Sequence, residues 1–396
     1  MRARAALFLP VYVPTFLLAL GQGMMVPTLP LYAQTFVDSF SLISLAIAAA
    51  GVGALIANVP AGVMLNRIGR RRAMLIGTAS IAASTLAVGL AAVYPELVLA
   101  RLVAGVGTSL WNISRMAYLA ESTTPAERGR ALSTFGGVSR IGTFAGPALG
   151  GGLAYLYGLS APFFASAALA LAATAVSALY VHDTSGAAHL SRRARWSALG
   201  ATARLHWREL STAGAAQIFV QMIRAGRQLI VPLYGASALG LDVAAIGSIV
   251  SISAAIDMSL FIPAGLIMDR MGRKWATVPS FTVMAVGMAL IPLSGDFFGL
   301  LIATAIIGVG NGMSSGTMMT LGADLAPPEA TGEFMGLWRL IGDLGSTGGP
   351  VVVGGVADLI GLGAAAFTLT GVGVVAATTL ALFVRETLHR GRATAH

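Results

Sequence analysis

Runs of about 20 apolar residues recur along almost the whole chain and decide what it can fold into. A helix of about 20 residues crosses the hydrocarbon core of a bilayer and satisfies its own backbone hydrogen bonds there. Charged residues are too scarce to cover these runs in water, since the 396-residue chain is 56% hydrophobic and 10% charged. The sequence therefore predicts an all-α polytopic membrane protein.

We predict twelve transmembrane helices from these runs. They cover residues 8–32, 42–65, 73–93, 95–119, 131–157, 161–181, 210–234, 243–267, 275–293, 297–322, 333–357 and 363–384. Most connections are a few residues long, but the one after the sixth span is long, polar and basic. The chain therefore divides into an N-terminal six-helix bundle (residues 1–182), a linker (183–209) and a C-terminal six-helix bundle (210–396).

The linker carries an amphipathic pattern. Trp196, Leu199, Ala203 and Trp207 are spaced to share one face of a helix, with arginines around them. This pattern indicates a helix that lies at the membrane surface. A flexible linker is the alternative that the sequence leaves open.

The basic residues are distributed asymmetrically. Of 25 lysines and arginines, 19 lie in the termini and even-numbered connections, six lie within spans, and none lies in an odd-numbered connection. The odd-numbered connections carry only acids, namely Asp38, Glu96, Asp242, Asp296 and Asp358. The positive-inside rule predicts that both termini and the linker are cytoplasmic. We expect a cell (inner or plasma) membrane, and the preference for arginine over lysine indicates a bacterial genome.

The second half of the chain repeats the first at an offset of 203 residues. The stretch SRIGTFAGPALGGG at 139–152 returns in register as GDLGSTGGPVVVGG at 342–355. Six spans per repeat is an even number, so the halves share one orientation and are related by an axis along the membrane normal. A binding site is expected between the halves, near the middle of the membrane.

The repeated stretch is rich in glycine. Gly142, Gly146 and Gly150 lie four residues apart, so a helix places them on one face, where a neighbouring helix can approach closely. We predict that this face packs the fifth span against the other half, most simply the eighth span, and seals the periplasmic side. The residues assigned to this packing are Gly142, Gly146, Pro147, Gly150, Gly151, Gly345, Gly349 and Pro350.

Four motifs resemble those of the major facilitator superfamily, and within it the twelve-span drug:proton antiporters. The loop signature occurs twice, as GVMLNRIGRRR at 62–72 and GLIMDRMGRK at 265–274. LGQGMMVPTLPLY (20–32), LVLARLVAGVGTS (97–109) and GTFAGPALGG (142–151) are similar to the first-, fourth- and fifth-span patterns. The resemblance implies a secondary transporter that works by alternating access. The fifth-span signature favours proton-coupled efflux of amphipathic or drug-like small molecules.

The two loop signatures are candidates for a conformational latch. Each has a glycine for a reversing turn and arginines that can reach Glu121 or Asp324 at the end of a nearby span. The alternative is that these arginines only follow the positive-inside rule. Asn66 departs from the family, which carries a titratable aspartate there. The latch residues are Gly62, Asn66, Arg67, Gly69, Arg70, Glu121, Asp269, Arg270, Gly272, Arg273 and Asp324.

Charges inside the spans indicate a wet cavity, because each costs roughly 2.5–3.5 kcal/mol at the centre of a membrane helix. The spans hold six arginines, at positions 101, 115, 140, 224, 227 and 339, but only two acids. Polar residues share one face of the fourth span and one face of the seventh. The predicted cavity residues are Gln22, Met25, Thr108, Asn112, Arg115, Gln221, Arg224, Gln228 and Asn311. For Arg115 and Arg339, snorkelling toward the membrane surface is the alternative.

Asp257 and Asp343 are the two acids deep enough to carry protons across the membrane. Asp257 and Arg140 lie at similar depths on spans that pack together in the superfamily, so we predict an ion pair between them. Asp343 has Arg339 one helical turn away. We assign proton coupling to Asp257, Asp343, Arg140 and Arg101. The expected partners are a small-molecule substrate, protons and the lipid bilayer, with no nucleic acid and no cofactor beyond the proton gradient, for a monomeric protein.

The sequence also bears on two other functions, symport and intramembrane catalysis. The excess of intramembrane arginines also suits a proton symporter that takes up an organic anion. An intramembrane enzyme is disfavoured because the sequence has no cysteine and its five histidines all lie outside the predicted spans. We therefore expect no enzymatic activity and no metal site.

Overall fold

A computed structural model of the chain describes residues 7–182 and 192–388. In the first half, a short π-helical turn (Phe8–Tyr12) leads into the first of six long helices. These helices are α2 (Val13–Gln34), α3 (Phe40–Ile68), α4 (Arg70–Leu90), α5 (Tyr94–Glu121), α6 (Pro125–Tyr157) and α7 (Ala161–Tyr180).

The second half repeats this succession with two interruptions. Its helices are α8 (Arg192–Leu205), α9 (Trp207–Leu233), α10 (Val243–Ser259), α11 (Phe261–Arg270), α12 (Arg273–Leu290), α13 (Phe297–Met313), α14 (Thr317–Leu325), α15 (Thr331–Ile360) and α16 (Leu362–Leu382). Three short helical turns, Tyr234–Ala238, Ile291–Leu293 and Pro328–Ala330, join them. Helices α10 and α11 form the eighth span, and α13 and α14 form the tenth.

The described residues thus form twelve membrane-length segments, as predicted. Ten of them are both long and apolar enough to cross a membrane; the other two, α6 and α9, are long but more polar. The largest difference in boundaries is at α6, which begins at Pro125 rather than near 131, since proline is favoured in the first turn of a helix. The linker contains helix α8, while residues 183–191 lie outside the described part of the chain.

Two acids of the odd-numbered connections cap the helices that follow them. Asp242 accepts a hydrogen bond from the Ala245 amide at 2.7 Å, and Asp296 accepts one from the Gly299 amide at 2.8 Å. Each carboxylate satisfies an amide that the first turn leaves without a helical partner. We name this end of the molecule, with the connections at 35–39, 91–93, 158–160, 239–242, 294–296 and 361, the acidic end. The opposite end, which carries α8 and the two loop signatures, is the basic end.

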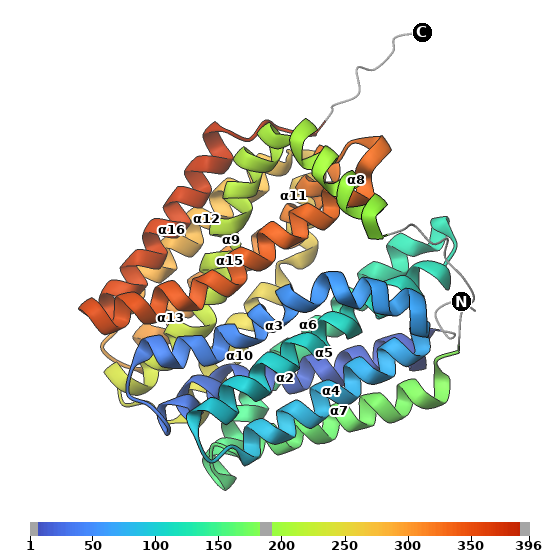
Figure 1. Cartoon of the computed structure of the whole chain (residues 1–396). Coiled ribbons are helices and arrows are strands. Elements are labelled where there is room, and N and C mark those ends of the chain that lie inside the picture. Colours follow the sequence, from blue (N-terminus) through green and yellow to red (C-terminus); the bar gives the residue numbers. More distant parts are fainter. Residues whose placement is uncertain (1–6, 183–191, 389–396) are drawn as a thin grey trace.

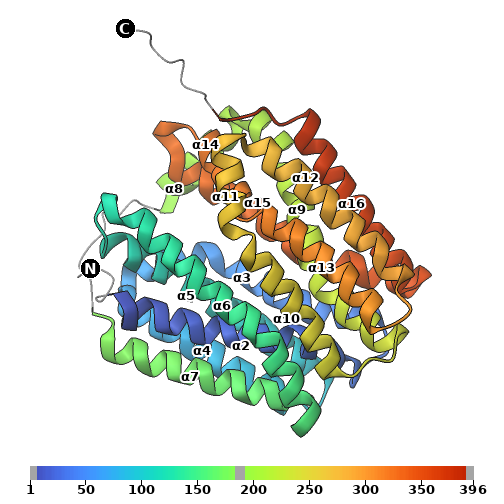
Figure 2. The ribbon, with the colours of Figure 1, turned by 180° about the vertical axis from the view of Figure 1, so that it is seen from behind.

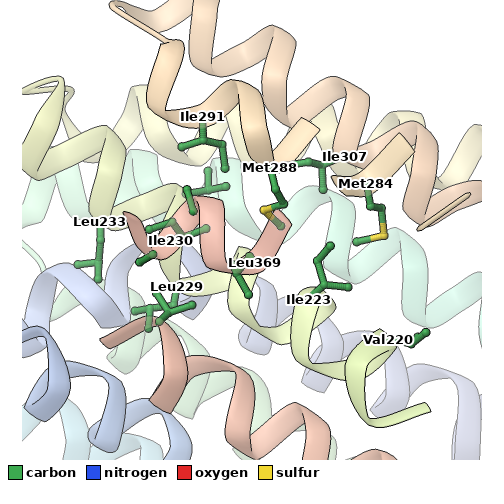
Figure 3. Packing of buried hydrophobic residues seen from close by; sticks show 14 of the residues in the cluster. Val220, Ile223, Leu229, Ile230, Leu233, Met284, Met288, Ile291, Ile307 and Leu369 are labelled. Carbon is green, nitrogen blue, oxygen red and sulfur yellow. The ribbon is translucent and has the colours of Figure 1, made fainter. Parts of the chain in front are cut away.

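Small and aliphatic side chains build the interior of each half. Figure 3 shows this packing in the second half, where Ile223 and Leu229 of α9 lie among Met284 and Met288 of α12 and Leu369 of α16. All five side chains are fully buried. Since lipid is as apolar as these side chains, close van der Waals contact stabilises the bundle. The second half is therefore held together by a packed interior, and the same core continues into the first half through Leu29, Tyr32 and Ile43.

The halves meet along two seams (Figure 1). Helix α3 packs against α15 on one face, and α6 packs against α10 on the other, as Figure 2 shows from behind. Both views show the two groups of helices close together at the acidic end and diverging toward the end that carries α8. The seams therefore close the acidic end.

Hydrogen bonds reinforce this closure. Asp358 of α15 accepts hydrogen bonds from the Ser39 hydroxyl at 2.6 Å and from the amides of Phe40 and Ser41, so it caps α3 of the other half. The Gln34 amide donates to the Ser237 hydroxyl at 3.0 Å. The start of α3, where backbone amides lack helical partners, is thus one point of attachment between the halves.

A serine joins the other seam at a bend in α6. The Ser251 hydroxyl of α10 accepts from the Ala148 amide and donates to the Phe144 carbonyl, both at 2.8 Å. An unbroken helix would join these two backbone groups to each other, but Pro147 lies between them. Ser251 satisfies both groups from across the seam, as backbone in a bilayer requires.

The predicted contact between the fifth and eighth spans is present, since α6 packs against α10, but its assignment to the glycine face is wrong. Helix α2 of the same half, not the eighth span, lies against Gly142, Gly146 and Gly150: a Cβ on Gly146 would stand 2.6 Å from the Gly23 Cα. Gly345 and Gly349 pack against α9 of their own half in the same manner. A glycine period of four shows that a helix approaches closely, but it does not identify that helix.

Other positions make the close approach between the halves. A Cβ on Gly151 would stand 2.5 Å from the Val243 carbonyl of α10, and one on Gly354 would stand 2.5 Å from the Phe40 carbonyl of α3. These two contacts are related by the 203-residue repeat. The predicted inter-bundle contact is thus confirmed for Gly151 and also for Pro147, whose carbonyl faces α10, while Pro350 lines a cavity between the halves.

Candidate functional site

Two adjoining cavities, each of about 520 Å³, lie between the halves. They share a boundary formed by Ile47, Ala50, Gly51, Arg101, Arg227 and Gln228. The cationic cavity also has Arg140, Gln221, Arg224, Asn311, Ser315 and Thr347 in its wall. The apolar cavity is lined by Gln22, Met25, Val26, Leu29, Pro30, Ile81, Thr108, Val231, Val250, Asp257 and Ile307, among others. One site thus offers charged and apolar surface side by side.

Asp257 of α10 is the centre of a charge cluster. Arg140 Nη1, from the other half, donates to Asp257 Oδ1 at 3.1 Å, which confirms the predicted ion pair. Asn311 Nδ2 donates to Oδ2 at 2.5 Å, and Arg227 Nη2 lies 3.8 Å from the same oxygen. Groups on α6, α13 and α9 therefore surround this one carboxylate, and Arg140 reaches it from the other half.

The interruptions in the eighth and tenth spans lie beside this cluster. Arg224 donates to the Ser314 carbonyl at 3.0 Å and to its hydroxyl at 2.7 Å, and Arg140 donates to the Ser315 hydroxyl. Gly316 follows with φ of +76°, a left-handed conformation, directly before the start of α14. Broken membrane helices offer backbone and hydroxyl groups that a continuous helix would keep for itself. This break differs from the continuous tenth span predicted at 297–322, although Ser-Ser-Gly is a turn signal.

Most predicted cavity residues reach the cavities. Gln22, Met25 and Thr108 line the apolar cavity, Gln221, Arg224 and Asn311 line the cationic one, and Gln228 lines both. Arg101, predicted for proton coupling, also lines both. Arg227, which the site prediction left out, lies in both walls and contacts Asp257.

Asn112 and Arg115 are the exceptions, since neither is among the described residues that line these cavities. Arg115 is buried, donates to Asn112 at 2.9 Å and stacks 4.2 Å from the centre of the Phe135 ring. The polar face of α5 therefore extends beyond the cavity toward the basic end, where α6 covers it. The spacing of these residues predicted that they share one face of α5, but it did not predict which of them lie at the depth of the cavities.

Asp343 sits in the α3–α15 seam rather than in a cavity wall. Asn58 of α3 donates to Asp343 Oδ2 at 3.0 Å, and Asn58 in turn accepts from the Ser109 hydroxyl at 2.6 Å. Arg339, one turn before Asp343, has an exposed side chain. Position 343 is the repeat counterpart of position 140. Each seam thus carries a polar bridge from this repeat-related position. The bridge is an ion pair in the α6–α10 seam and an asparagine–aspartate hydrogen bond in the α3–α15 seam.

Ion pairs at the basic end join helices within each half. Arg70 pairs with Glu121, and Arg273 Nε lies 2.8 Å from Asp324 Oδ2, so both predicted pairs are present. Gly69 and Gly272 have φ of +84° and +118°, as a reversing turn requires. Arg67, Asp269 and Arg270 are exposed. The side chain of Asn66 lies outside the described residues.

Glu386 adds a second contact to the loop signature of the C-terminal half. It accepts hydrogen bonds from the amides of Arg273 and Lys274 at 2.9 Å each, at the start of α12. Burial acts to raise the pKa of Glu386, but the hydrogen bonds from Leu388, Lys274 and Arg273 outweigh it and lower the pKa. The carboxylate therefore stays charged at the positive end of the helix dipole.

Comparison with known proteins agrees with this architecture. A family model described as Major Facilitator Superfamily matches residues 11–222 and 213–395, and so covers both halves. The chain is 24% identical to an uncharacterized MFS-type transporter of Methanocaldococcus jannaschii over 89% of this chain and 91% of that protein. It is 28% identical to Multidrug resistance protein 2 of Bacillus subtilis over 43% and 42% of the two chains.

A eukaryotic relative and solved structures extend the similarity. The synaptic vesicular amine transporter of Rattus norvegicus is 26% identical over 84% of this chain and 64% of its own length. The human organic anion transporter TETRAN shares the fold with a TM-score of 0.72 at 17% identity, covering 96% of this chain and 100% of that one. A POT family transporter in complex with 5-aminolevulinic acid has a TM-score of 0.78 at 13% identity, covering 96% of each chain. With two six-helix halves, a cavity between them and a family model that matches both, the chain belongs to the Major Facilitator Superfamily of membrane transporters.

Proposed function

We propose that this transporter is a proton-coupled antiporter that exports an amphipathic small molecule from the cytoplasm, by alternating access. The observation that carries the proposal is the Arg140–Asp257 ion pair, which joins the two halves in the wall of the central cavities. A proton carrier must sit where its charge affects both the substrate and the relative position of the halves. Asp257 meets both requirements.

Protonation of Asp257 would remove the negative charge that holds Arg140. A buried charge that loses its partner is strongly unfavourable, so the contact between α6 and α10 weakens when the proton arrives. Antiport requires that proton and substrate occupy the site in turn, so a substrate that binds while Asp257 is ionised must leave when the proton arrives. A substrate anion that competes with the Asp257 carboxylate for Arg140 or Arg227 would instead bind together with the proton, which is the requirement for the alternative function, symport.

The closed acidic end corresponds to one of the two states of alternating access. With the basic end in the cytoplasm, by the positive-inside rule, the seams at α3–α15 and α6–α10 close the side away from the cytoplasm. In the proposed cycle an exporter loads its substrate in this state, whereas an importer would release its substrate from it. We further propose that the chain acts as a monomer in a bacterial cell membrane, needs no cofactor besides the proton gradient and has no enzymatic activity.

The test is transport in proteoliposomes with an imposed pH gradient and a panel of cationic, neutral and anionic amphipathic compounds. We expect at least one compound to move against the direction of proton flow, and Asp257→Asn to stop that movement. Arg339→Gln, which changes an exposed arginine of a span, is the matched control. Accumulation that occurs only together with proton entry would contradict export and favour uptake of an organic anion by symport.

A further inference from the structure

The charges around the two cavities do not balance. Four arginines, at 101, 140, 224 and 227, line the cavities, against Asp257 as the one acid among the described lining residues. Arg140 and Arg227 both lie within ion-pair distance of Asp257. The described residues give Arg101 and Arg224 no such acid. The site therefore carries an excess of positive charge in a membrane interior, where charge is costly.

Arg224 is held in place, but neither Arg224 nor Arg101 is neutralised by an acid within ion-pair distance among the described residues. Arg224 is fixed by neutral groups, the carbonyl and hydroxyl of Ser314 and the side-chain oxygen of Gln221. The Nε atoms of Arg101 and Arg224 are buried and have no hydrogen-bond partner among the described residues. A guanidinium that is oriented, desolvated and short of acceptors is prepared for an oxyanion.

The apolar cavity begins at the same arginines. Arg101, Arg227 and Gln228 stand on the boundary, and beyond it lie aliphatic side chains such as Val26, Leu29 and Val231. A ligand that spans both cavities must therefore have a compact polar head and an apolar body. Such sites are mostly apolar, with a few polar groups that fix the orientation of the ligand.

We infer that the substrate is an amphipathic organic anion, whose carboxylate, sulfonate or phosphate head is bound by Arg101 and Arg224 and whose body fills the apolar cavity. This inference rests on the proposed function in so far as it takes the cavities as the substrate site. A cationic substrate has only Asp257 to bind it, and Arg140 and Arg227 already surround that carboxylate. Binding of such a cation would leave all four arginines in place.

The test is calorimetric binding to the purified protein in nanodiscs, without a gradient. The probes share one body and differ in charge: 2-naphthoate, 2-naphthamide and 2-naphthylmethylammonium, with naphthalene-2-sulfonate and decanoate as further anions. We expect at least one anion to bind about tenfold tighter than the amide and the ammonium, a difference of about 1.4 kcal/mol. Arg224→Gln and Arg101→Gln should each remove that preference, Arg224→Lys should retain part of it, and Arg339→Gln should leave it unchanged.

Three results would overturn the inference: tightest binding of the ammonium, equal binding of the naphthoate and the amide, or no binding of any anion in the series. Unchanged anion binding in both glutamine variants would do the same. Since binding is measured without a gradient, the result is independent of proton coupling. An anion that binds here but does not respond to a pH gradient in proteoliposomes would contradict the proposed antiport and leave the substrate class standing.

Discussion

The Asp257 carboxylate accepts hydrogen bonds from Arg140 and Asn311 and lies near Arg227, so it contacts groups on three other helices. Asparagine keeps the size of this side chain but cannot release or bind the proton. We predict that Asp257→Asn abolishes transport driven by a pH gradient and retains exchange of substrate without a gradient. Flux in proteoliposomes with and without the gradient measures both. Gradient-driven flux at the wild-type rate would remove Asp257 from the coupling mechanism.

Asp343 is the second candidate for a proton-binding group, since it bridges the other seam through Asn58. Unlike Asp257, it does not line the cavities among the described residues, so it would couple protons to the seam rather than to the substrate. We predict that Asp343→Asn lowers the number of protons exchanged per substrate but does not stop transport. The pH gradient at which net flux reverses gives that number. An unchanged reversal point would assign Asp343 a structural role.

At the scale of residues, the sequence predicted the ion pairs better than the hydrogen bonds that surround them. Arg140 and Asp257 were matched because both lie at the same depth on spans expected to pack together. The contacts of Ser314 and Ser315 could not be predicted, because they exist only where α13 ends in mid-membrane. The role of Ser251 could not be predicted for a related reason, because it depends on backbone groups next to Pro147 in another helix.

Among the elements, the break in the tenth span depends on Gly316. Its φ of +76° costs a residue with a Cβ roughly 1–2 kcal/mol, so alanine favours a straighter helix and displaces the Ser314 and Ser315 acceptors. We predict that Gly316→Ala lowers transport and shifts the thermal midpoint down. The matched control is Gly336→Ala, which has open space at the Cβ position and lies within helix α15. Equal transport in both variants would show that the break is dispensable.

The contact between α2 and α6 predicts a different outcome for a bulky residue at Gly146. Because Gly23 lies directly against it, leucine would wedge two helices of one half apart, and overpacking of this kind costs about 1–3 kcal/mol. We predict that Gly146→Leu lowers the thermal stability of the protein in detergent. Gly152→Leu, on the same helix with open space at its Cβ position, should have little effect. Similar loss in both variants would indicate a general effect of leucine in α6.

Elements were the scale at which the sequence was most informative. Twelve segments, their boundaries to within a few residues and the reversing turns at Gly69 and Gly272 follow from apolar length and turn chemistry. Which helix packs against which did not follow from the sequence, as the glycine face of α6 shows. Small residues allow close approach to any helix, and only the assembled bundle decides which helix takes the position.

For the whole molecule, closure at the acidic end is testable with a cross-link. The sequence contains no cysteine, so two introduced thiols report without background. Gln34 and Ser237 belong to different halves and their side chains are hydrogen-bonded at 3.0 Å. We predict that a short bis-methanethiosulfonate reagent, whose span replaces the length of the glutamine side chain, cross-links Gln34→Cys/Ser237→Cys, that transport then falls to background and that a reductant restores it. Each single variant is the control, and full transport by the cross-linked protein would show that this end need not open.

The two interruptions fall in one half only, although the halves are repeats. Their counterparts α3 and α5 run unbroken over Phe40–Ile68 and Tyr94–Glu121. Helices bend where their hydrogen-bond ladder is interrupted, whereas continuous helices move as rods. In mechanical terms, the first half is a set of unbroken rods, whereas the second half has a break at Gly316 and a milder irregularity at Leu260, on either side of the charge cluster around Asp257. If Asp257 is the proton carrier that we propose, its protonation acts beside both positions, and its effect passes to the short helices α11 and α14 before it reaches a whole bundle.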